Sequence, residues 1–209
     1  MYKIMARITR IKAQKNQRRV NVYLDGKFAF GLDADNLLKA GLKVDQELTE
    51  KEIENLVFKN EFQKLVDRTL RLISARPRSE KEIADYLRKR KVGPRLIEAV
   101  IKKLKSLGQL DDLEFARWWV EQRVAFRPRG RMGLTMELKR KGINLEIIEA
   151  TVGGIDELFL AQKVASKRLR AYKKLGPMAF RQKMTAFLSR RGFSWEAIKE
   201  TVEKFSEKR

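Results

Sequence analysis

Two pairs of closely spaced carboxylates are the residues best suited to holding a divalent cation: Asp33 with Asp35, and Asp111 with Asp112. Neighbouring acidic side chains can bind a hard cation such as Mg²⁺ in a metal-dependent nuclease. Asp111 and Asp112, however, directly precede a predicted helix that opens at Leu113, where capping and the helix dipole also explain acidic residues. We therefore favour capping, and keep a nuclease as an alternative that replacement of both residues by Asn would test.

Other catalytic chemistry lacks its usual residues. The chain contains no His and no Cys, which removes the commonest general base, thiolate metal ligands and disulfides. It has no G-x-x-x-x-G-K-[ST] segment that would cradle nucleotide phosphates. We expect a protein that is not an enzyme and that has no catalytic residue, cofactor or metal.

Clustered cations are the more informative residues. One row occupies the ends of three predicted helices, and a second row flanks two prolines. Such positions are explained in part by the negative pole of a helix dipole and by solvation, but they also suit contacts with phosphates or acidic side chains. We take both rows as candidate contacts with a partner or DNA: Arg88, Lys89, Arg90, Lys139, Arg140, Lys141, Arg190 and Arg191 in the first, and Arg76, Arg78, Arg127, Arg129 and Arg131 in the second.

The net charge of the chain is +21. The excess of basic over acidic residues is 4 in residues 1–60, 8 in 61–110, 1 in 111–155 and 8 in 156–209. Such a balance is typical of a protein that binds nucleic acid or an acidic protein surface, although a Lys- and Glu-rich thermophilic surface is an alternative. The uneven distribution predicts that the middle segment docks mainly on protein and that the flanking segments supply electrostatic attraction.

The sequence predicts neither membrane insertion nor export. No apolar run approaches eighteen residues, and the first seven residues lack the apolar core of a secretory signal. Together with the absence of Cys, this composition leads us to expect a cytoplasmic protein that does not bind membranes.

An aromatic pair, Trp118–Trp119, lies in the middle segment near Phe115. Adjacent helical residues cannot share one face, and the three-residue spacing from Phe115 places Trp118 in the predicted core. We expect Trp119 at an edge or interface, where it could stack on a base.

The N-terminal residues have the pattern of a small β-rich domain. Residues 4–13 and 19–24 are rich in β-branched residues, and the Asp25–Gly26 turn leads into a returning strand at 27–30. Asp33 or Asp35 is expected to cap a short helix that ends near Gly41.

Beyond these residues the periodicity becomes helical. Thr49 and Glu52 have the spacing of a capping box, as do Ser79 and Glu82. Apolar residues from Phe62 to Ile73 recur on one helix face, and residues 76–78 end that helix at a proline.

One pattern then occurs three times. Five apolar positions recur at shifts of 51 and 50 residues, with a proline before each middle helix and a good N-cap before each third helix. The matched sets are Ile83, Leu87, Val92, Ile97 and Ile101; Leu134, Leu138, Ile143, Ile148 and Val152; and Met184, Leu188, Phe193, Ile198 and Val202, with prolines Pro77, Pro128 and Pro177. We predict a mainly α protein in which three tandem three-helix, helix-turn-helix-like repeats form an elongated, curved array.

The expected domains are residues 1–50 as the β-rich N-terminal domain, 51–110 as a linking helix with the first repeat, 111–155 as the second repeat and 156–209 as the third. The third repeat has an extra residue between Pro177 and Leu188.

The central motif resembles that of a known family. Residues 107–116, Arg123, Arg129–Gly130 and residues 137–143 resemble the RecX family, the bacterial regulators of the RecA recombinase. The resemblance covers about residues 62–206, and the β-rich N-terminal residues are similar to those of longer RecX proteins.

The resemblance implies a cytoplasmic, monomeric, non-enzymatic regulator. Its partner would be the RecA filament on single-stranded DNA, with double-stranded DNA as a further candidate ligand. Binding along the filament groove would limit filament growth, ATP hydrolysis, strand exchange and repressor cleavage in DNA repair and the SOS response. The alternative from charge alone is an independent, non-specific DNA-binding protein of the nucleoid type.

Overall fold

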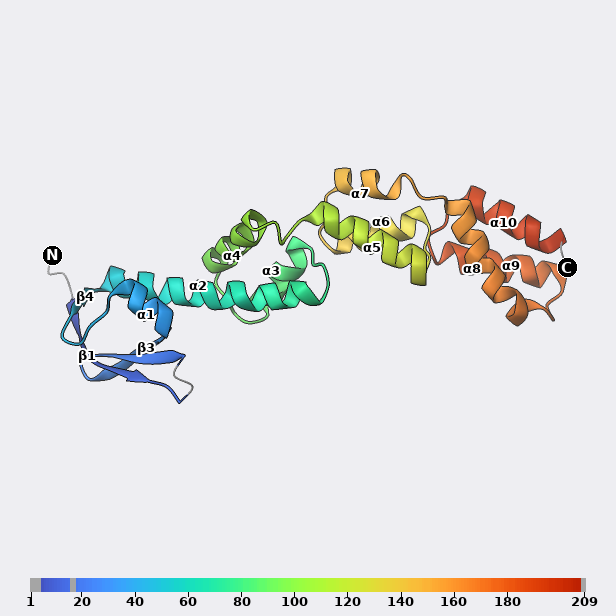
Figure 1. Cartoon of the computed structure of the whole chain (residues 1–209). Helices are drawn as coiled ribbons and strands as arrows, with labels where there is room; N and C mark the ends of the chain where they lie inside the picture. Colours follow the sequence, from blue (N-terminus) through green and yellow to red (C-terminus); the bar gives the residue numbers. More distant parts are fainter. Residues whose placement is uncertain (1–4, 16–17, 208–209) are drawn as a thin grey trace. The chain divides into compact units, whose positions relative to one another are not determined.

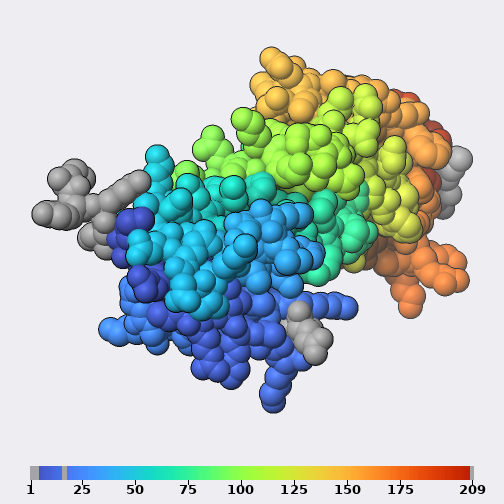
Figure 2. Space-filling model, turned by 60° about the vertical axis from the view of Figure 1, so that its left-hand side comes forward, coloured from blue at the N-terminus to red at the C-terminus, as the bar shows by residue number. Residues whose placement is uncertain are grey.

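The computed structural model describes residues 5–15 and 18–207 (Figure 1). It divides into two compact units, Met1–Leu72 with Val92–Leu104, and Ile73–Lys91 with Lys105–Arg209. In the first unit, β1 (Met5–Ala13), β2 (Arg19–Leu24), β3 (Lys27–Asp33) and β4 (Glu47–Thr49) form an antiparallel sheet in the order β3-β2-β1-β4, coloured blue in Figures 1 and 2. The predicted strand residue Ile4 lies outside the described residues.

The turn between β2 and β3 has the predicted chemistry. Asp25 and Gly26 both have positive φ, 46° and 79°, which is the backbone of the tight hairpin turn that suits the twist of two strands. One face of the sheet packs around Ile8, Val22 and Leu32, which are 0%, 0% and 1% exposed. The hairpin prediction is therefore confirmed, whereas the short strand β4 was not predicted.

The helix α1 (Ala34–Ala40) begins directly after Asp33, one of the two expected cap residues. Asp33 occupies the N-cap position but accepts no capping hydrogen bond, and its carboxylate lies 3.3 Å from the Arg19 guanidinium instead. Gly41 ends the helix with φ of 60°, as predicted from its freedom at positive φ.

The helix α2 (Glu50–Ala75) starts with the predicted capping box. The Thr49 hydroxyl accepts from Glu52 N–H, and the Glu52 carboxylate accepts from Thr49 N–H at 2.7 Å. Asn60 is a buried polar residue on this helix: its amide donates to Gly31 O at 2.8 Å and accepts from Asp33 N–H at 3.3 Å. These bonds fasten α2 to β3, and the helix ends before Arg76 and Pro77 as expected.

The helices α3 (Glu80–Arg88) and α4 (Pro94–Ser106) follow. Ser79 caps α3 by accepting from Glu82 N–H at 3.2 Å, but Glu82 does not complete the predicted capping box, because its carboxylate binds two cations. Pro94 is the first residue of α4, where its missing N–H costs no hydrogen bond.

The second unit contains the other two groups of three helices. They are α5 (Asp112–Phe126), α6 (Arg131–Arg140) and α7 (Leu145–Val152), followed by α8 (Glu157–Tyr172), α9 (Pro177–Ser189) and α10 (Trp195–Glu207). Asn144 and Ser194 accept the capping bonds of α7 and α10 as predicted. One continuous core joins both groups, green to red in Figure 1, because each group alone leaves an apolar face uncovered.

The fold class is confirmed: a small antiparallel sheet precedes three helical repeats, with ten helices in the described part of the chain. The expected position of one proline is wrong. Pro177 does not precede its middle helix but is the first residue of α9, which has an added N-terminal turn and buries Phe180. None of the described helices is long and apolar enough to cross a membrane.

Candidate partner-binding surface

The first and second repeats meet through polar contacts that we call the first joint. The Ser79 hydroxyl donates to Lys141 O at 2.7 Å. The backbone N–H of Glu80 donates to the Asp112 carboxylate at 2.8 Å. The start of α3 is thus bonded to the start of α5 and to the end of α6.

The second and third repeats meet in the same manner at the second joint. Gly130 N–H donates to Arg191 O at 3.1 Å, and Arg131 N–H donates to the Glu157 carboxylate at 2.8 Å. A methyl group on Gly130 would lie 2.2 Å from Gly192 O. This close backbone approach explains the glycines. The two joints involve equivalent positions, since Gly130 follows Ser79 by 51 residues and Arg191 follows Lys141 by 50, but the donor to the carbonyl is a side chain at the first joint and a backbone N–H at the second.

A half-buried glutamate neutralises cations at the first joint. Arg76 makes two hydrogen bonds of 3.0 Å to the Glu82 carboxylate, and Lys141 makes one of 2.5 Å. Burial favours the neutral form of Glu82, but the hydrogen bonds from these cations outweigh it and hold the pKa of Glu82 below its usual value. The paired side chains therefore join α3 to the end of α6.

Glu137 is a second such acceptor. Its carboxylate lies 2.7 Å from Arg123 and 2.7 Å from Arg129, and it accepts from the Trp119 indole N–H at 2.8 Å. The Arg123 and Lys141 cations lie 4.5 and 4.8 Å from the centre of the Trp119 ring.

Trp118 packs against the core beside Phe115, as expected, but it is only partly buried. Both Trp118 and Trp119 are partly buried and pack against the margin of the core. Trp119 lies at an edge, as expected, but cations and Glu137 occupy its surroundings.

The candidate cations thus fall into two groups. Some are bonded within the protein: Arg76, Arg129 and Lys141 to glutamates, Arg131 to Ile155 O at 2.9 Å, and Arg191 to Pro128 O at 3.2 Å. Arg78 is grouped with them by burial alone: its buried Nε has no hydrogen-bond partner among the described residues, and burial and Arg76 lower its pKa. Others are exposed: Arg88, which pairs with Asp85 at 2.7 Å, Arg90, which lies over the Tyr86 ring, and Lys89, Arg127, Lys139, Arg140 and Arg190. The exposed group remains available to a partner.

The carboxylate pairs act as caps and ion-pair partners. Asp111 accepts from Leu113 N–H and Glu114 N–H at 2.7 and 3.1 Å, which confirms the capping interpretation. Asp112 caps α3 rather than α5, and burial raises its pKa. Within residues 5–15 and 18–207, no three His, Cys, Asp or Glu side chains form a group that could hold a metal ion.

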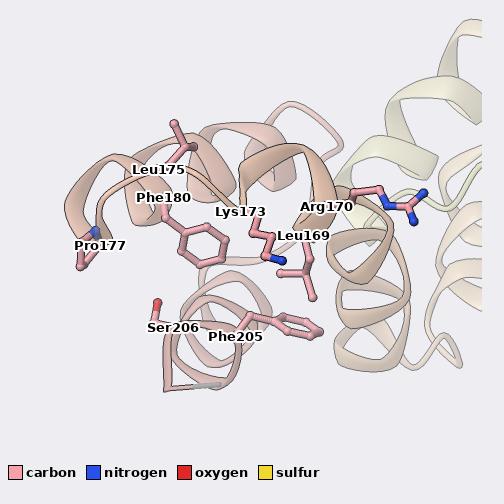
Figure 3. A pocket seen from close by; sticks show the side chains of 8 residues that line it. All are labelled: Leu169, Arg170, Lys173, Leu175, Pro177, Phe180, Phe205 and Ser206. Atoms are coloured by element: carbon pink, nitrogen blue, oxygen red, sulfur yellow. The ribbon is translucent and has the colours of Figure 1, made fainter. Parts of the chain in front are cut away.

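The third repeat contains a hollow of about 760 Å³ between α8, α9 and α10. Figure 3 shows the Phe180 and Phe205 rings and the Lys173 side chain around it, with Arg170 farther away. The Ser206 hydroxyl at its edge donates to Val202 O at 2.7 Å. Its described lining residues do not include a carboxylate.

Sequence reasoning missed the residues that distinguish the joints. Glu82 and Glu137 bind the cations of the first joint, and Phe126, Lys163 and Phe187 lie beside the second. The signal was present: the 51- and 50-residue shifts that align the apolar positions also align Glu82 with Gly133 and Glu137 with Phe187.

Four family models match consecutive parts of the chain. The regulatory protein RecX N-terminal domain matches residues 6–49, and the first, second and third three-helix domains of RecX match residues 67–104, 111–152 and 156–202. The matched ranges contain the sheet and most of the helices of the three repeats.

Curated relatives support the same family. Regulatory protein RecX of Bacillus licheniformis is 37% identical over 198 residues, 93% of this chain and 75% of that protein. The corresponding protein of Bacillus subtilis strain 168 is 36% identical over 195 residues, 91% of this chain and 74% of that protein. That of Listeria monocytogenes serovar 1/2a is 33% identical over 197 residues, 92% and 73% of the two chains.

Solved structures have the same fold. A crystal structure of regulatory protein RecX aligns with a TM-score of 0.72 and 29% identity, covering 95% of this chain and 99% of that chain. RecX from Lactobacillus salivarius, at 22% identity and a TM-score of 0.62 over 70% and 97% of the two chains, shows the fold alone. Since four domain models and relatives above 30% identity agree along the chain, this protein belongs to the RecX family of regulatory proteins.

Proposed function

We propose that this protein regulates the RecA recombinase by binding along its filament on single-stranded DNA and limiting filament growth. ATP hydrolysis, strand exchange and repressor cleavage by the recombinase fall as a consequence, in DNA repair and the SOS response. The regulatory name of its relatives supports a regulatory role. The observation that supports a filament as the partner is that successive repeats are joined at equivalent positions.

Repeated joints favour a repeated partner. Successive repeats that are joined at equivalent positions present equivalent helices at regular intervals, as subunits of a filament also do. Each contact can be weak, because binding of one repeat raises the effective concentration of the next beside its own subunit. The protein acts as a monomer in the cytoplasm, without catalysis and without a membrane partner.

The test is the rate of single-stranded-DNA-dependent ATP hydrolysis by the RecA recombinase of the same organism. We expect inhibition with this protein at well below one molecule per recombinase subunit, together with shorter filaments in electron micrographs. Unchanged hydrolysis and filament length at equimolar protein would refute the proposal.

Charge favours one alternative, a nucleoid-type protein that binds bare DNA on its own. The net charge of +21 is sufficient for non-specific phosphate binding. This alternative requires tight binding to bare double-stranded DNA that falls by orders of magnitude between low and physiological salt. Weak binding to bare duplex at physiological salt, with retained binding to recombinase-coated single strands, excludes it.

A further inference from the structure

The two joints contain the same three cations at equivalent positions. The first joint has Arg76 before α3, Arg123 on α5 and Lys141 after α6. The second joint has Arg127 before α6, Arg168 on α8 and Arg191 after α9, at shifts of 51, 45 and 50 residues. The 45-residue shift also aligns the buried pairs Phe115–Ala116 and Leu160–Ala161 of α5 and α8.

The acids that neutralise these cations are present at the first joint only. Glu82 and Glu137 bind Arg76, Arg123 and Lys141 there. At the second joint, Gly133 occupies the position of Glu82, and Phe187 occupies that of Glu137. Among the described residues, Arg127, Arg168 and Arg191 form no ion pair with a carboxylate, so the second joint keeps a local excess of positive charge.

These cations line a hollow of about 300 Å³ at the second joint, which we call the second-joint hollow. Lys163 and Lys167 of α8 add two further cations to it. Its lining consists of cations and apolar residues without a carboxylate: Phe126, Arg127, Pro128, Lys163, Val164, Lys167, Arg168, Phe187 and Arg191.

Internal contacts hold part of this cluster in place. The Arg168 and Arg191 guanidinium carbons lie 4.9 and 4.8 Å from the centre of the Phe187 ring, and Arg191 donates to Pro128 O at 3.2 Å. Burial lowers the pKa of Arg191, and the nearby Arg129 and Arg168 cations lower it further. An anion relieves this repulsion, whereas the first joint already contains its own anions.

An exposed aromatic ring lies beside the cations. Phe126, the last residue of α5, is 75% exposed although it is a large apolar side chain. A ring next to a cation cluster is the pairing used by proteins that bind single-stranded nucleic acids, in which cations contact the backbone and aromatic side chains stack on bases.

We propose that the second-joint hollow binds a short segment of single-stranded nucleic acid directly. A backbone phosphate lies among Arg127, Lys167 and Arg168, and a base stacks on Phe126. The site deepens the proposed regulatory function, on which its role at a filament rests, but direct binding of the strand is a property of this chain alone.

The test is fluorescence anisotropy of a labelled oligothymidylate titrated with the full-length protein in the absence of recombinase. Arg127→Ala/Lys167→Ala/Arg168→Ala, three exposed positions, is expected to weaken binding about tenfold or more and to reduce the slope of log K against log [salt] by about 2. Phe126→Ala is expected to weaken binding about tenfold with little change in that slope, because stacking carries no charge.

Matched controls remove equal charge and a comparable ring elsewhere in the third repeat. Arg181→Ala/Lys183→Ala/Lys199→Ala takes three exposed cations from α9 and α10, and Trp195→Ala removes a 63% exposed aromatic beside Glu196. Both are expected to bind within about twofold of the parent protein. Equal losses in the cluster and control variants would mean diffuse attraction and would overturn the site.

Two further experiments distinguish a nucleic-acid ligand from an acidic peptide. Polyglutamate of matched charge should compete poorly, and Phe126→Ala should not alter that competition. Strong competition together with full binding by Phe126→Ala would overturn the proposal in favour of an acidic peptide. Phe187→Glu introduces at the second joint the acid that Glu137 supplies at the first. This variant should weaken strand binding in any preparation that circular dichroism shows to be folded.

The outcomes for the site and for the proposed function are distinguishable. If the cluster variants bind the strand normally while the parent protein inhibits recombinase ATP hydrolysis, the site is wrong and the regulatory function stands. If the cluster variants lose strand binding but the parent protein leaves hydrolysis unchanged, the site stands and the regulatory function is wrong.

Discussion

Arg76 and Arg127 occupy equivalent positions in successive repeats, yet within the described part of the chain only Arg76 has a carboxylate partner. The same holds for Arg123 and Arg168. In these two pairs, the residue at one distant position therefore decides whether the basic side chain forms an internal ion pair. Composition counts both kinds alike, which is why the sequence predicted two undivided rows of basic contacts.

Replacement of Glu82 tests the structural group. Glu82→Gln should lower the free energy of unfolding by about 2 kcal/mol at pH 7, because hydrogen bonds to a charged acceptor are lost. Since the folded state depresses the pKa of Glu82, its stabilisation is present above the unfolded pKa and is lost as pH falls through the folded pKa. Urea unfolding should therefore show that parent and variant converge below about pH 4. The exposed Glu149→Gln is the control, and a difference that grows in acid would contradict the assignment.

At the scale of elements, the joints depend on backbone contact between helix termini. Gly133 lies inside α6, where alanine would ordinarily strengthen the helix by about 1 kcal/mol. A methyl group at this position would lie 2.4 Å from Arg191 O, a backbone atom that cannot move without shifting the end of α9. Helix propensity and steric exclusion therefore predict opposite signs for the same change.

Steric exclusion should prevail. Gly133→Ala is expected to destabilise the protein by about 2 kcal/mol or more, as overpacking of a close contact does. Gly154→Ala, where nothing lies within 4 Å of the added methyl group, should change stability by about 0.5 kcal/mol or less. Chemical denaturation of both variants measures their free energies of unfolding. A Gly133→Ala variant that is more stable than the parent protein would show that the end of α9 does not approach α6 so closely.

Elements governed by local chemistry could be predicted from the sequence. The Asp25–Gly26 turn, the Thr49 capping box and the repeats follow from turn, capping and apolar periods that are legible within a few residues. The strand β4 could not be predicted, because three residues are too few to show a periodic pattern. The hydrogen bond from Glu80 N–H to Asp112 could not be predicted either, because an acidic residue before a helix does not indicate which distant helix it also contacts. The added turn of α9 reflects one inserted residue, which periodicity alone does not place.

At the scale of the whole molecule, the charge is unevenly shared among the repeats. Residues 61–110 and 156–209 each carry a net charge of +8, and residues 111–155 carry +1. We propose that the outer repeats supply most of the electrostatic attraction to a filament and that the middle repeat docks mainly on protein. The second-joint hollow fits this division, because four of its five cations belong to the third repeat: Lys163, Lys167 and Arg168 lie on α8, and Arg191 follows α9.

Neutralising the exposed basic residues 88–90 at the end of α3 tests the proposed electrostatic role of the outer repeats. Arg88→Ala/Lys89→Ala/Arg90→Ala should weaken filament binding more at low than at high salt, since screening removes the same attraction. The control Lys12→Ala/Lys27→Ala/Lys43→Ala removes equal charge from exposed positions of the N-terminal residues. Sedimentation with filaments across a salt series measures both, and equal losses at every salt concentration would contradict an electrostatic role for residues 88–90.

A reconstruction of this protein bound to its recombinase filament on single-stranded DNA tests the central claim most directly. The account predicts density along the filament groove, with successive repeats against successive recombinase subunits. Density confined to bare DNA, or a single repeat in contact with the filament, would contradict it.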